Sequence, residues 1–172
     1  MNRPSEEQIA AWYPRLFRTA LRLTGSREES ADLTQQAFCK ALVAWDRFDG
    51  RSQRTTWLHG ILVNCLRDQI RRSSVRSAED LQEWSLDNSS RTSGCVAEEL
   101  GRQEQLGQLR EAIQGLDQNL QQPFVAAVLD GYSYGEVAEM LDIPVGTVGH
   151  RVYRARQRLS SVMLESFPEE LQ

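Results

Sequence analysis

Apolar residues recur at steps of three and four along most of this chain, and this spacing limits what it can fold into. The clearest run is Val145, Val148, Val152, Ala155 and Leu159. Such spacing places apolar side chains on one face of an α-helix. Because no segment alternates polar and apolar residues, we predict an all-α fold without strands. The runs predict helices over residues 9–24, 27–47, 57–72, 106–116, 123–130, 134–141 and 145–164.

Residues at the ends of these segments predict where several helices begin. Ser133 and Glu136 have the spacing of a capping box, in which each side chain bonds the backbone N–H of the other residue. Thr55 or Thr56 is predicted to be the N-cap of the third helix. Pro14 is expected in the first turn of the main segment of its helix, where a missing N–H is tolerated.

Residues 133–158 have the pattern of a helix-turn-helix, in which a tight turn joins a short helix to a longer, basic one. The apolar face of the second helix leaves Gly149, His150, Tyr153 and Arg154 on or near a strip that faces solvent. A helix fits the major groove of DNA, with its N-terminal residues closest to the bases. The pattern favours DNA binding, although a basic helix on the surface of an ordinary bundle would have a similar sequence.

The charge is unevenly distributed along the chain. The net charge of −4 argues against a nucleic-acid partner, but residues 1–76 hold 13 basic and 8 acidic side chains. Residues 77–104 hold 2 basic and 7 acidic side chains and are rich in serine, which predicts an acidic linker. We therefore predict two small helical domains, over 1–76 and 105–172, joined by this linker.

Several classes of protein are excluded by what the sequence lacks. No apolar run approaches the roughly 20 residues of a membrane span, and no signal peptide is visible, so we expect a cytoplasmic protein without membrane insertion. Three cysteines are too few for a disulfide framework; Cys39 and Cys65 are expected to be buried thiols, and Cys95 falls in the linker. Without metal-ligand spacing, a phosphate loop or a nucleophile, we expect no metal, no cofactor and no enzymatic activity.

Two blocks of residues resemble the extracytoplasmic-function (ECF) subfamily of the sigma-70-type sigma factors of bacterial RNA polymerase. Residues 32–38 (DLTQQAF), with Ala41, Trp45, Trp57-Leu58, Asn64, Asp68 and Arg71-Arg72, resemble the second conserved region of that family. Residues 132–141 (YSYGEVAEML), 143–148 and 151–159 resemble the fourth region. The two blocks occur in the family's order and separation.

The resemblance implies a sigma factor that directs core polymerase to specific promoters and initiates transcription. The family's partners are the clamp helices and flap region of core polymerase, promoter DNA and an anti-sigma factor, and the protein is expected to be a monomer outside the holoenzyme. Core polymerase is expected to contact Asp32, Gln35 and Gln36. The −10 element is expected to contact Arg51, Arg54, Asn64, Arg67, Arg71 and Arg72. The −35 element is expected to contact Thr147, Gly149, His150, Arg151, Tyr153, Arg154 and Arg158.

This sequence departs from the family pattern at three of these positions. Gln36 stands where an acid is more usual, which weakens pairing with a basic clamp surface or shifts it to hydrogen bonding. Gly149 and His150 stand where a basic residue and a serine are usual, so the −35 sequence cannot be copied from relatives. Two alternatives remain: a helix-turn-helix regulator that does not replace a sigma subunit, and a helical adaptor that binds only protein.

Overall fold

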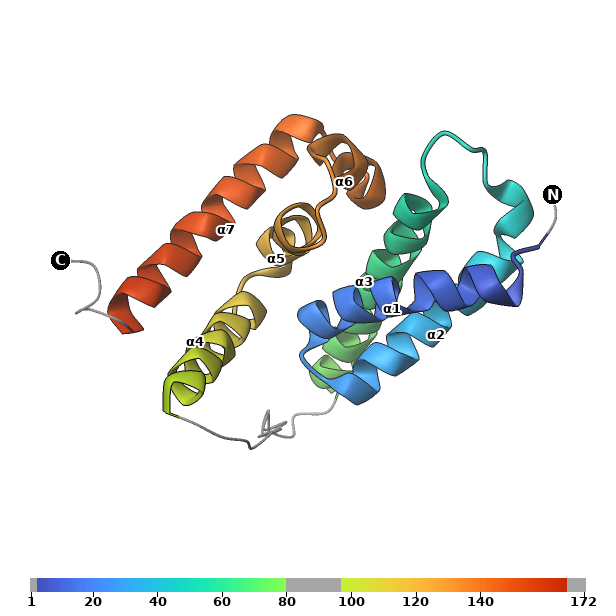
Figure 1. Ribbon diagram of the computed structural model, residues 1–172. Helices are drawn as coiled ribbons and strands as arrows, with labels where there is room; N and C mark the ends of the chain where they lie inside the picture. The colour runs from blue at the N-terminus through green and yellow to red at the C-terminus, as the bar shows by residue number, and fades with distance from the viewer. Residues whose placement is uncertain (1–2, 80–96, 167–172) are drawn as a thin grey trace.

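The computed structural model describes residues 3–79 and 97–166, and every regular element in these ranges is helical. This confirms the predicted all-α fold. None of the helices described is both long and apolar enough to cross a bilayer. The principal helices are α1 (Glu6–Thr24), α2 (Arg27–Val43), α3 (Arg54–Glu79), α4 (Ala97–Gln114), α5 (Gln118–Phe124), α6 (Tyr134–Leu141) and α7 (Val145–Ser166) (Figure 1). Two shorter elements are the 3-10 turn η1 (Trp45–Arg47) and the π-helical turn η2 (Val125–Leu129).

The N-terminal half is formed by α1, α2 and α3, which pack on a core that includes the fully buried Leu16, Leu33 and Leu62. A capping box between Ser5 and Gln8 starts α1. The helix therefore begins earlier than the sequence suggested, and Pro14 lies in its interior rather than in its first turn. The proline is exposed, so its ring faces solvent and not the core.

The start of α3 also differs from the prediction. The helix begins at Arg54, so Thr55 and Thr56 lie inside its first turn and neither is the N-cap. The side chain of Thr56 is buried and donates a hydrogen bond to Glu136 Oε1 at 3.2 Å, far along the chain. A threonine that resembled a local cap in sequence therefore serves a long-range contact.

The helix-turn-helix is formed by α6 and α7, as predicted. Ser133 Oγ accepts from the backbone N–H of Glu136, and the Glu136 carboxylate accepts from the backbone N–H of Ser133, which confirms the capping box. Asp142 ends α6 in the left-handed conformation, with φ of 52°. Buried Val137 and Val148 hold the two helices together, so the angle between them is fixed by apolar contact.

The two halves of the chain pack against each other. Figure 1 shows α4 and α5 between the α1–α3 half and α7, with α6 near α3. One continuous core contains Leu16 and Leu62 from the first half together with Val125 and Leu159 from the second. Of the predicted linker, residues 77–79 belong to α3 and residues 97–104 to α4, while residues 80–96, with Cys95, lie outside the described residues.

Candidate nucleic-acid interface

The predicted −35 residues lie on the second helix of the helix-turn-helix. His150, Tyr153, Arg154 and Arg158 are exposed on α7, and 60% of the Tyr153 surface is accessible. The Tyr153 hydroxyl accepts a hydrogen bond from Gln157 Nε2 at 2.9 Å, which orients the ring along the helix. These side chains form one polar strip beside the buried apolar face, and the strip is free to enter a groove of DNA.

The other three predicted −35 residues are less exposed. Thr147, Gly149 and Arg151 are half-buried. A Cβ at Gly149 would lie 3.6 Å from the ring of Tyr134 on α6, so the glycine leaves space in which this ring lies beside α7. Arg151 is close enough to Arg67 on α3 for its charge to act there: burial, reinforced by Arg151, lowers the pKa of the Arg67 guanidinium.

The predicted −10 residues do not form a single exposed surface. Asn64, Arg71 and Arg72 are exposed on α3. Arg71 Nη2 bonds Asp68 Oδ1 at 3.3 Å, one turn back on the same helix face. In contrast, Arg67 faces the second half of the molecule, where its Nε donates to Gln122 Oε1 at 3.0 Å and its Nη1 to the Leu141 carbonyl at 3.4 Å.

The loop before α3 rests on an aromatic cluster. The guanidinium of Arg54 lies 4.4 Å from the centre of the Trp45 ring and 4.8 Å from that of Phe48, a cation–π geometry. The Trp57 ring packs 5.3 Å from Phe48 and 5.9 Å from Trp45. Arg54 therefore anchors the base of the loop, whereas Arg51 is exposed and pairs with Asp49 at 3.0 Å.

The three residues predicted to meet core polymerase gather on α2. Asp32, Gln35 and Gln36 are all exposed and line one surface hollow together with Cys39 and Lys40. The prediction that Cys39 is buried is wrong, because it lies on this outer face of the helix. Cys65 is buried as predicted, and burial raises the pKa of its thiol.

A buried polar cluster joins the two halves, and nothing in the sequence pattern indicated it. Asp130, whose side chain is only 4% exposed, forms an ion pair with Arg22 and accepts from Thr19 Oγ1 at 2.7 Å. His59 Nε2 lies 3.0 Å from Thr19 Oγ1, and His59 Nδ1 lies 2.9 Å from the Tyr132 hydroxyl. Burial lowers the pKa of His59 and raises the pKa of Tyr132 to about 12, so both are neutral near pH 7.

Next to this cluster, α6 packs directly against α3. A Cβ at Gly60 would lie 3.5 Å from both the Cα and the carbonyl oxygen of Met140. Beside this close approach, Thr56 donates to Glu136, whose carboxyl pKa is held below its usual range by hydrogen bonds from Ser133. Asn64 opens onto a hollow whose opposite wall includes Glu139 and Met140. The face of α3 that was predicted to meet DNA is therefore partly covered.

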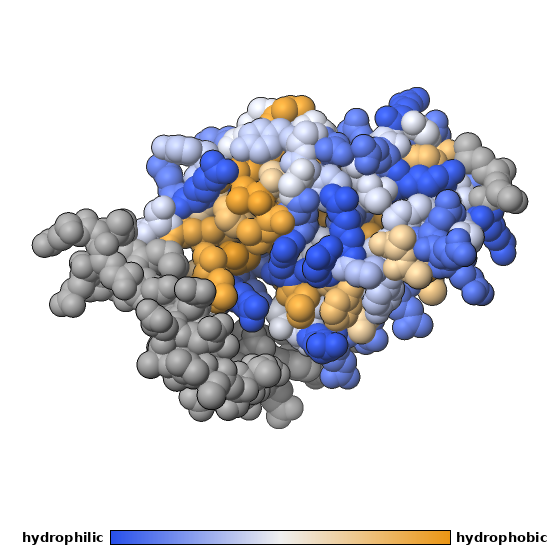
Figure 2. Space-filling view, viewed as in Figure 1, coloured by the Kyte–Doolittle hydropathy of each residue, from blue (hydrophilic) through white to orange (hydrophobic). Residues whose placement is uncertain are grey.

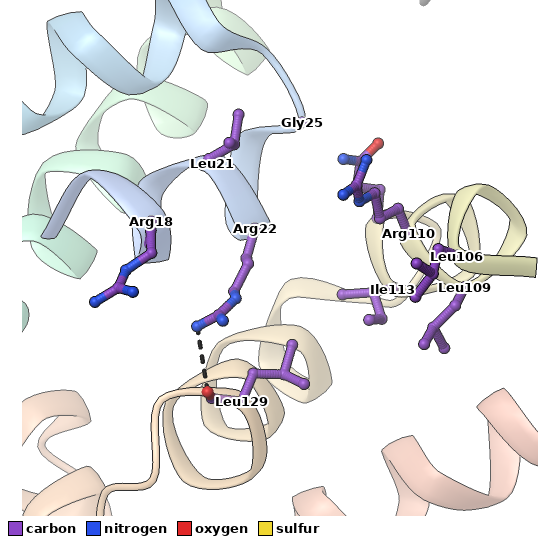
Figure 3. Close-up of a pocket in the computed structure, with 10 residues that line it drawn as sticks. Arg18, Leu21, Arg22, Gly25, Leu106, Leu109, Arg110, Ile113 and Leu129 are labelled. Carbon is purple, nitrogen blue, oxygen red and sulfur yellow. Dashed lines mark hydrogen bonds between the residues drawn. The ribbon is translucent and has the colours of Figure 1, made fainter. Parts of the chain in front are cut away.

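A groove of about 390 Å³ follows the contact between the halves on the side of α4 (Figure 3). Its walls include Leu21 from α1 and Leu109 and Ile113 from α4, and Figure 2 shows apolar side chains gathered over this part of the molecule. In Figure 3, Arg22 reaches from α1 to the Leu129 carbonyl, which it bonds at 3.2 Å. Within the described residues no three His, Cys, Asp or Glu side chains are grouped to hold a metal ion.

Comparison with known proteins gives matches to both halves of the chain. Residues 9–76 match the family Sigma-70 region 2, and residues 106–159 match the family Sigma-70, region 4. The ECF RNA polymerase sigma-E factor of Escherichia coli is 34% identical over 138 residues, 76% of this chain and 71% of the relative. That of Haemophilus influenzae is 30% identical over 142 residues, 79% of this chain and 75% of the relative.

Two solved structures share the fold. The sigma factor RpoE in complex with the anti-sigma factor NepR, from Bartonella quintana, superposes with a TM-score of 0.75 over 92% of this chain and 95% of that one, at 23% identity. CnrH in complex with the cytosolic domain of CnrY gives a TM-score of 0.66 over 91% and 85%, at 22% identity.

Proposed function

The chain belongs to the extracytoplasmic-function family of RNA polymerase sigma factors, and we propose that it performs this function through three separate surfaces. It directs core RNA polymerase to specific promoters and so starts transcription. The observation that carries this function is the order of its parts: a region 2 half is followed by a region 4 half that ends in a helix-turn-helix. We expect no catalytic activity of its own, because the polymerase forms the phosphodiester bonds.

The first surface is the outer face of α2, which we assign to core polymerase. Asp32 supplies an exposed carboxylate there, and the amides of Gln35 and Gln36 supply donors and acceptors beside it. Lys40, at the end of the same hollow, pairs with Asp68 at 3.1 Å, and this hydrogen bond raises the Lys40 pKa. The free charge of the hollow is therefore negative, which suits the basic clamp surface expected for this family.

The second surface reads the −10 element and includes Asn64, Arg71 and Arg72 on α3, with Arg51 in the loop before it. Arginines on this surface are expected to contact phosphate mainly, so they position the strand more than they specify its sequence. A base extruded from the non-template strand would be captured by the loop, and a shaped pocket offsets the few kcal/mol of unstacking.

The third surface reads the −35 element as duplex DNA. His150, Tyr153, Arg154 and Arg158 are its exposed members. A good bidentate contact to a base is worth about 1–3 kcal/mol of discrimination. Arg154→Ala is therefore expected to weaken binding to the preferred −35 sequence by roughly 5–150-fold. Arg156→Ala, on the same helix, is the matched control for the loss of one positive charge.

The decisive experiment is run-off transcription with purified core polymerase on a library of promoter fragments. We expect initiation at defined start sites that depends on this protein and falls with Asp32→Ala. A folded protein that binds one DNA sequence but never stimulates core polymerase would instead support the helix-turn-helix regulator. Unchanged DNA binding after both Arg154→Ala and His150→Ala would support the protein-only adaptor.

An anti-sigma factor is the further partner that we propose. Its support is the family itself, together with two fold neighbours whose structures were solved in complex with NepR and CnrY. We expect such a partner to cover the polymerase-binding face of α2. Addition of purified core polymerase should then displace it, and simultaneous binding of both to the same molecule would contradict this assignment.

A further inference from the structure

The start of α7 carries no charged residue. Residues 145–150 (VGTVGH) contain no arginine, lysine, aspartate or glutamate, and the first arginine of the helix is Arg151. The N-terminal residues of a recognition helix lie nearest the bases. At such positions arginine or lysine reads guanine, asparagine or glutamine reads adenine, and an acidic residue reads cytosine. None of these residue types stands between positions 145 and 150.

This part of the helix exposes apolar surface instead. Val145 is 52% exposed, and Tyr153, about two turns further along, is 60% exposed. Gly149 lies between them at a spacing of four residues, so the three positions follow one another along one side of the helix. Positions 145 and 153 are about 12 Å apart along the helix axis, which corresponds to between three and four steps of about 3.4 Å between base pairs.

An aromatic ring from α6 widens this apolar side at its middle. The Tyr134 ring lies against Gly149, where a Cβ would be 3.6 Å from Tyr134 Cε2 and 3.8 Å from Tyr134 Cδ2. Tyr134 is also 40% exposed, so its ring contacts α7 and still presents surface to solvent. A long side chain at position 149 would start in contact with this ring and compete with it for the same space. Glycine at this position leaves the ring in place.

We propose that Val145, Tyr153 and the Tyr134 ring beside Gly149 read the 5-methyl groups of thymine in the −35 element. The proposal rests on the sigma function assigned above, and it names what the third surface recognises: adjacent A·T pairs in place of guanine. Apolar side chains contact the thymine methyl group in the major groove, and thymine alone among the four bases presents a methyl group there. Tyr134, on the first helix of the helix-turn-helix, thereby becomes a specificity-determining residue.

Replacement of thymine by deoxyuridine tests this assignment, because it removes the methyl group and keeps the base pair. Run-off transcription on the promoter library first gives the preferred −35 sequence. Each thymine of that sequence, on either strand, is then replaced in turn, and binding by holoenzyme that contains the full chain is measured by competition. We expect at least two replacements to weaken binding by about fourfold each, since burial of one methyl group contributes about 0.8 kcal/mol. Replacements between the two promoter elements are the control and should change nothing.

Variants of the protein assign each methyl contact to a side chain. The measured quantity is the ratio of the affinities for the thymine and deoxyuridine forms of one promoter fragment, because damage to the fold lowers both affinities alike. We expect Tyr134→Ala and Tyr153→Ala each to reduce this ratio from about four to about one, at different thymines. Arg158→Ala is the matched control on the same surface, and it should weaken binding to both forms equally and keep the ratio.

A gain of charge at position 149 tests the same assignment from the other direction. Gly149→Arg places a guanidinium where the Tyr134 ring now lies, and arginine bonds guanine through two donors. We expect the preference at one base pair to shift from thymine to guanine by about 5–150-fold. Gly149→Ala, whose added methyl group would be in ordinary contact with the ring, is the control and should keep the wild-type preference.

The outcomes separate this proposal from the sigma function. A preferred −35 element without thymine, or one whose binding is insensitive to every replacement, would overturn the thymine reading while initiation at defined start sites continues. An unchanged ratio at every thymine in Tyr134→Ala would overturn the role of this residue. Absence of start-site-specific initiation on every promoter of the library would contradict the sigma function itself.

Discussion

Gly60 offers the sharpest test of how tightly the two halves fit. Its Cβ position lies 3.5 Å from the Cα and carbonyl oxygen of Met140, an ordinary van der Waals contact, so Gly60→Ala adds a methyl group without a clash. Alanine also favours the helix by about 1 kcal/mol over glycine. Gly60→Leu adds three more carbon atoms against the backbone of α6, and that backbone cannot move aside as a flexible side chain would. Overpacking of this kind costs about 1–3 kcal/mol.

The cost falls only on the packed arrangement of the two halves, because Gly60 contacts α6 only when the halves are together. A cost of about 1–3 kcal/mol corresponds to a decrease of about 5–150-fold in the ratio of packed to separated halves. We expect Gly60→Leu to lower energy transfer between dyes on Cys39 and on Ser160→Cys, whereas Gly60→Ala should retain or raise it. Far-UV circular dichroism confirms that both variants remain helical. Equal energy transfer in the leucine and alanine variants would refute the close packing of α3 on α6.

Three further predictions concern DNA binding, the core and pH. Arg71→Ala should weaken binding to −10 oligonucleotides of matched and scrambled sequence by the same factor, as measured by fluorescence anisotropy, because phosphate contacts carry no sequence information. Leu62→Ala, at a fully buried position, should lower the free energy of unfolding in urea by about 2.7–5.0 kcal/mol. Burial lowers the pKa of His59 below 6.5, so the unfolded chain binds a proton that the folded one does not. Stability should therefore fall as the pH drops below about 6.5 and stay level just above it, and His59→Gln should abolish this slope.

The helices were predictable from sequence because each one needs a continuous apolar face, and that face is visible in the spacing of residues. The helix-turn-helix was the clearest case, since the capping box at Ser133 and the apolar positions of α7 are local signals. The polar contacts between the halves were not predictable in the same way. His59 lies on a buried face, and its partner Tyr132 is 73 positions away along the chain.

In the candidate site too, features set by local sequence were predictable, whereas long-range contacts were not. Asp32 and Arg154 are exposed as expected, because a residue on the polar side of an amphipathic helix faces solvent, and their binding roles stay predictions. Arg54 and Arg67 were predicted to bind DNA because of their charge, yet Arg54 lies over aromatic rings and Arg67 donates to Gln122 in the second half. An arginine in a sequence indicates a positive charge, but the sequence does not show which group the arginine contacts.

The contact between the halves depends on the number of residues in the π-helical turn η2. In η2 the backbone N–H of Asp130 bonds the carbonyl of Val125, five residues back, at 3.0 Å. The wider turn holds one more residue than an α-helical turn, and each residue of an α-helix advances the chain by about 100°. Deletion of a single residue within η2 would restore a regular helix and rotate Asp130 away from Arg22 by about a quarter turn. The contact between the halves thus depends on the number of residues in η2 as well as on the charges that meet at Asp130.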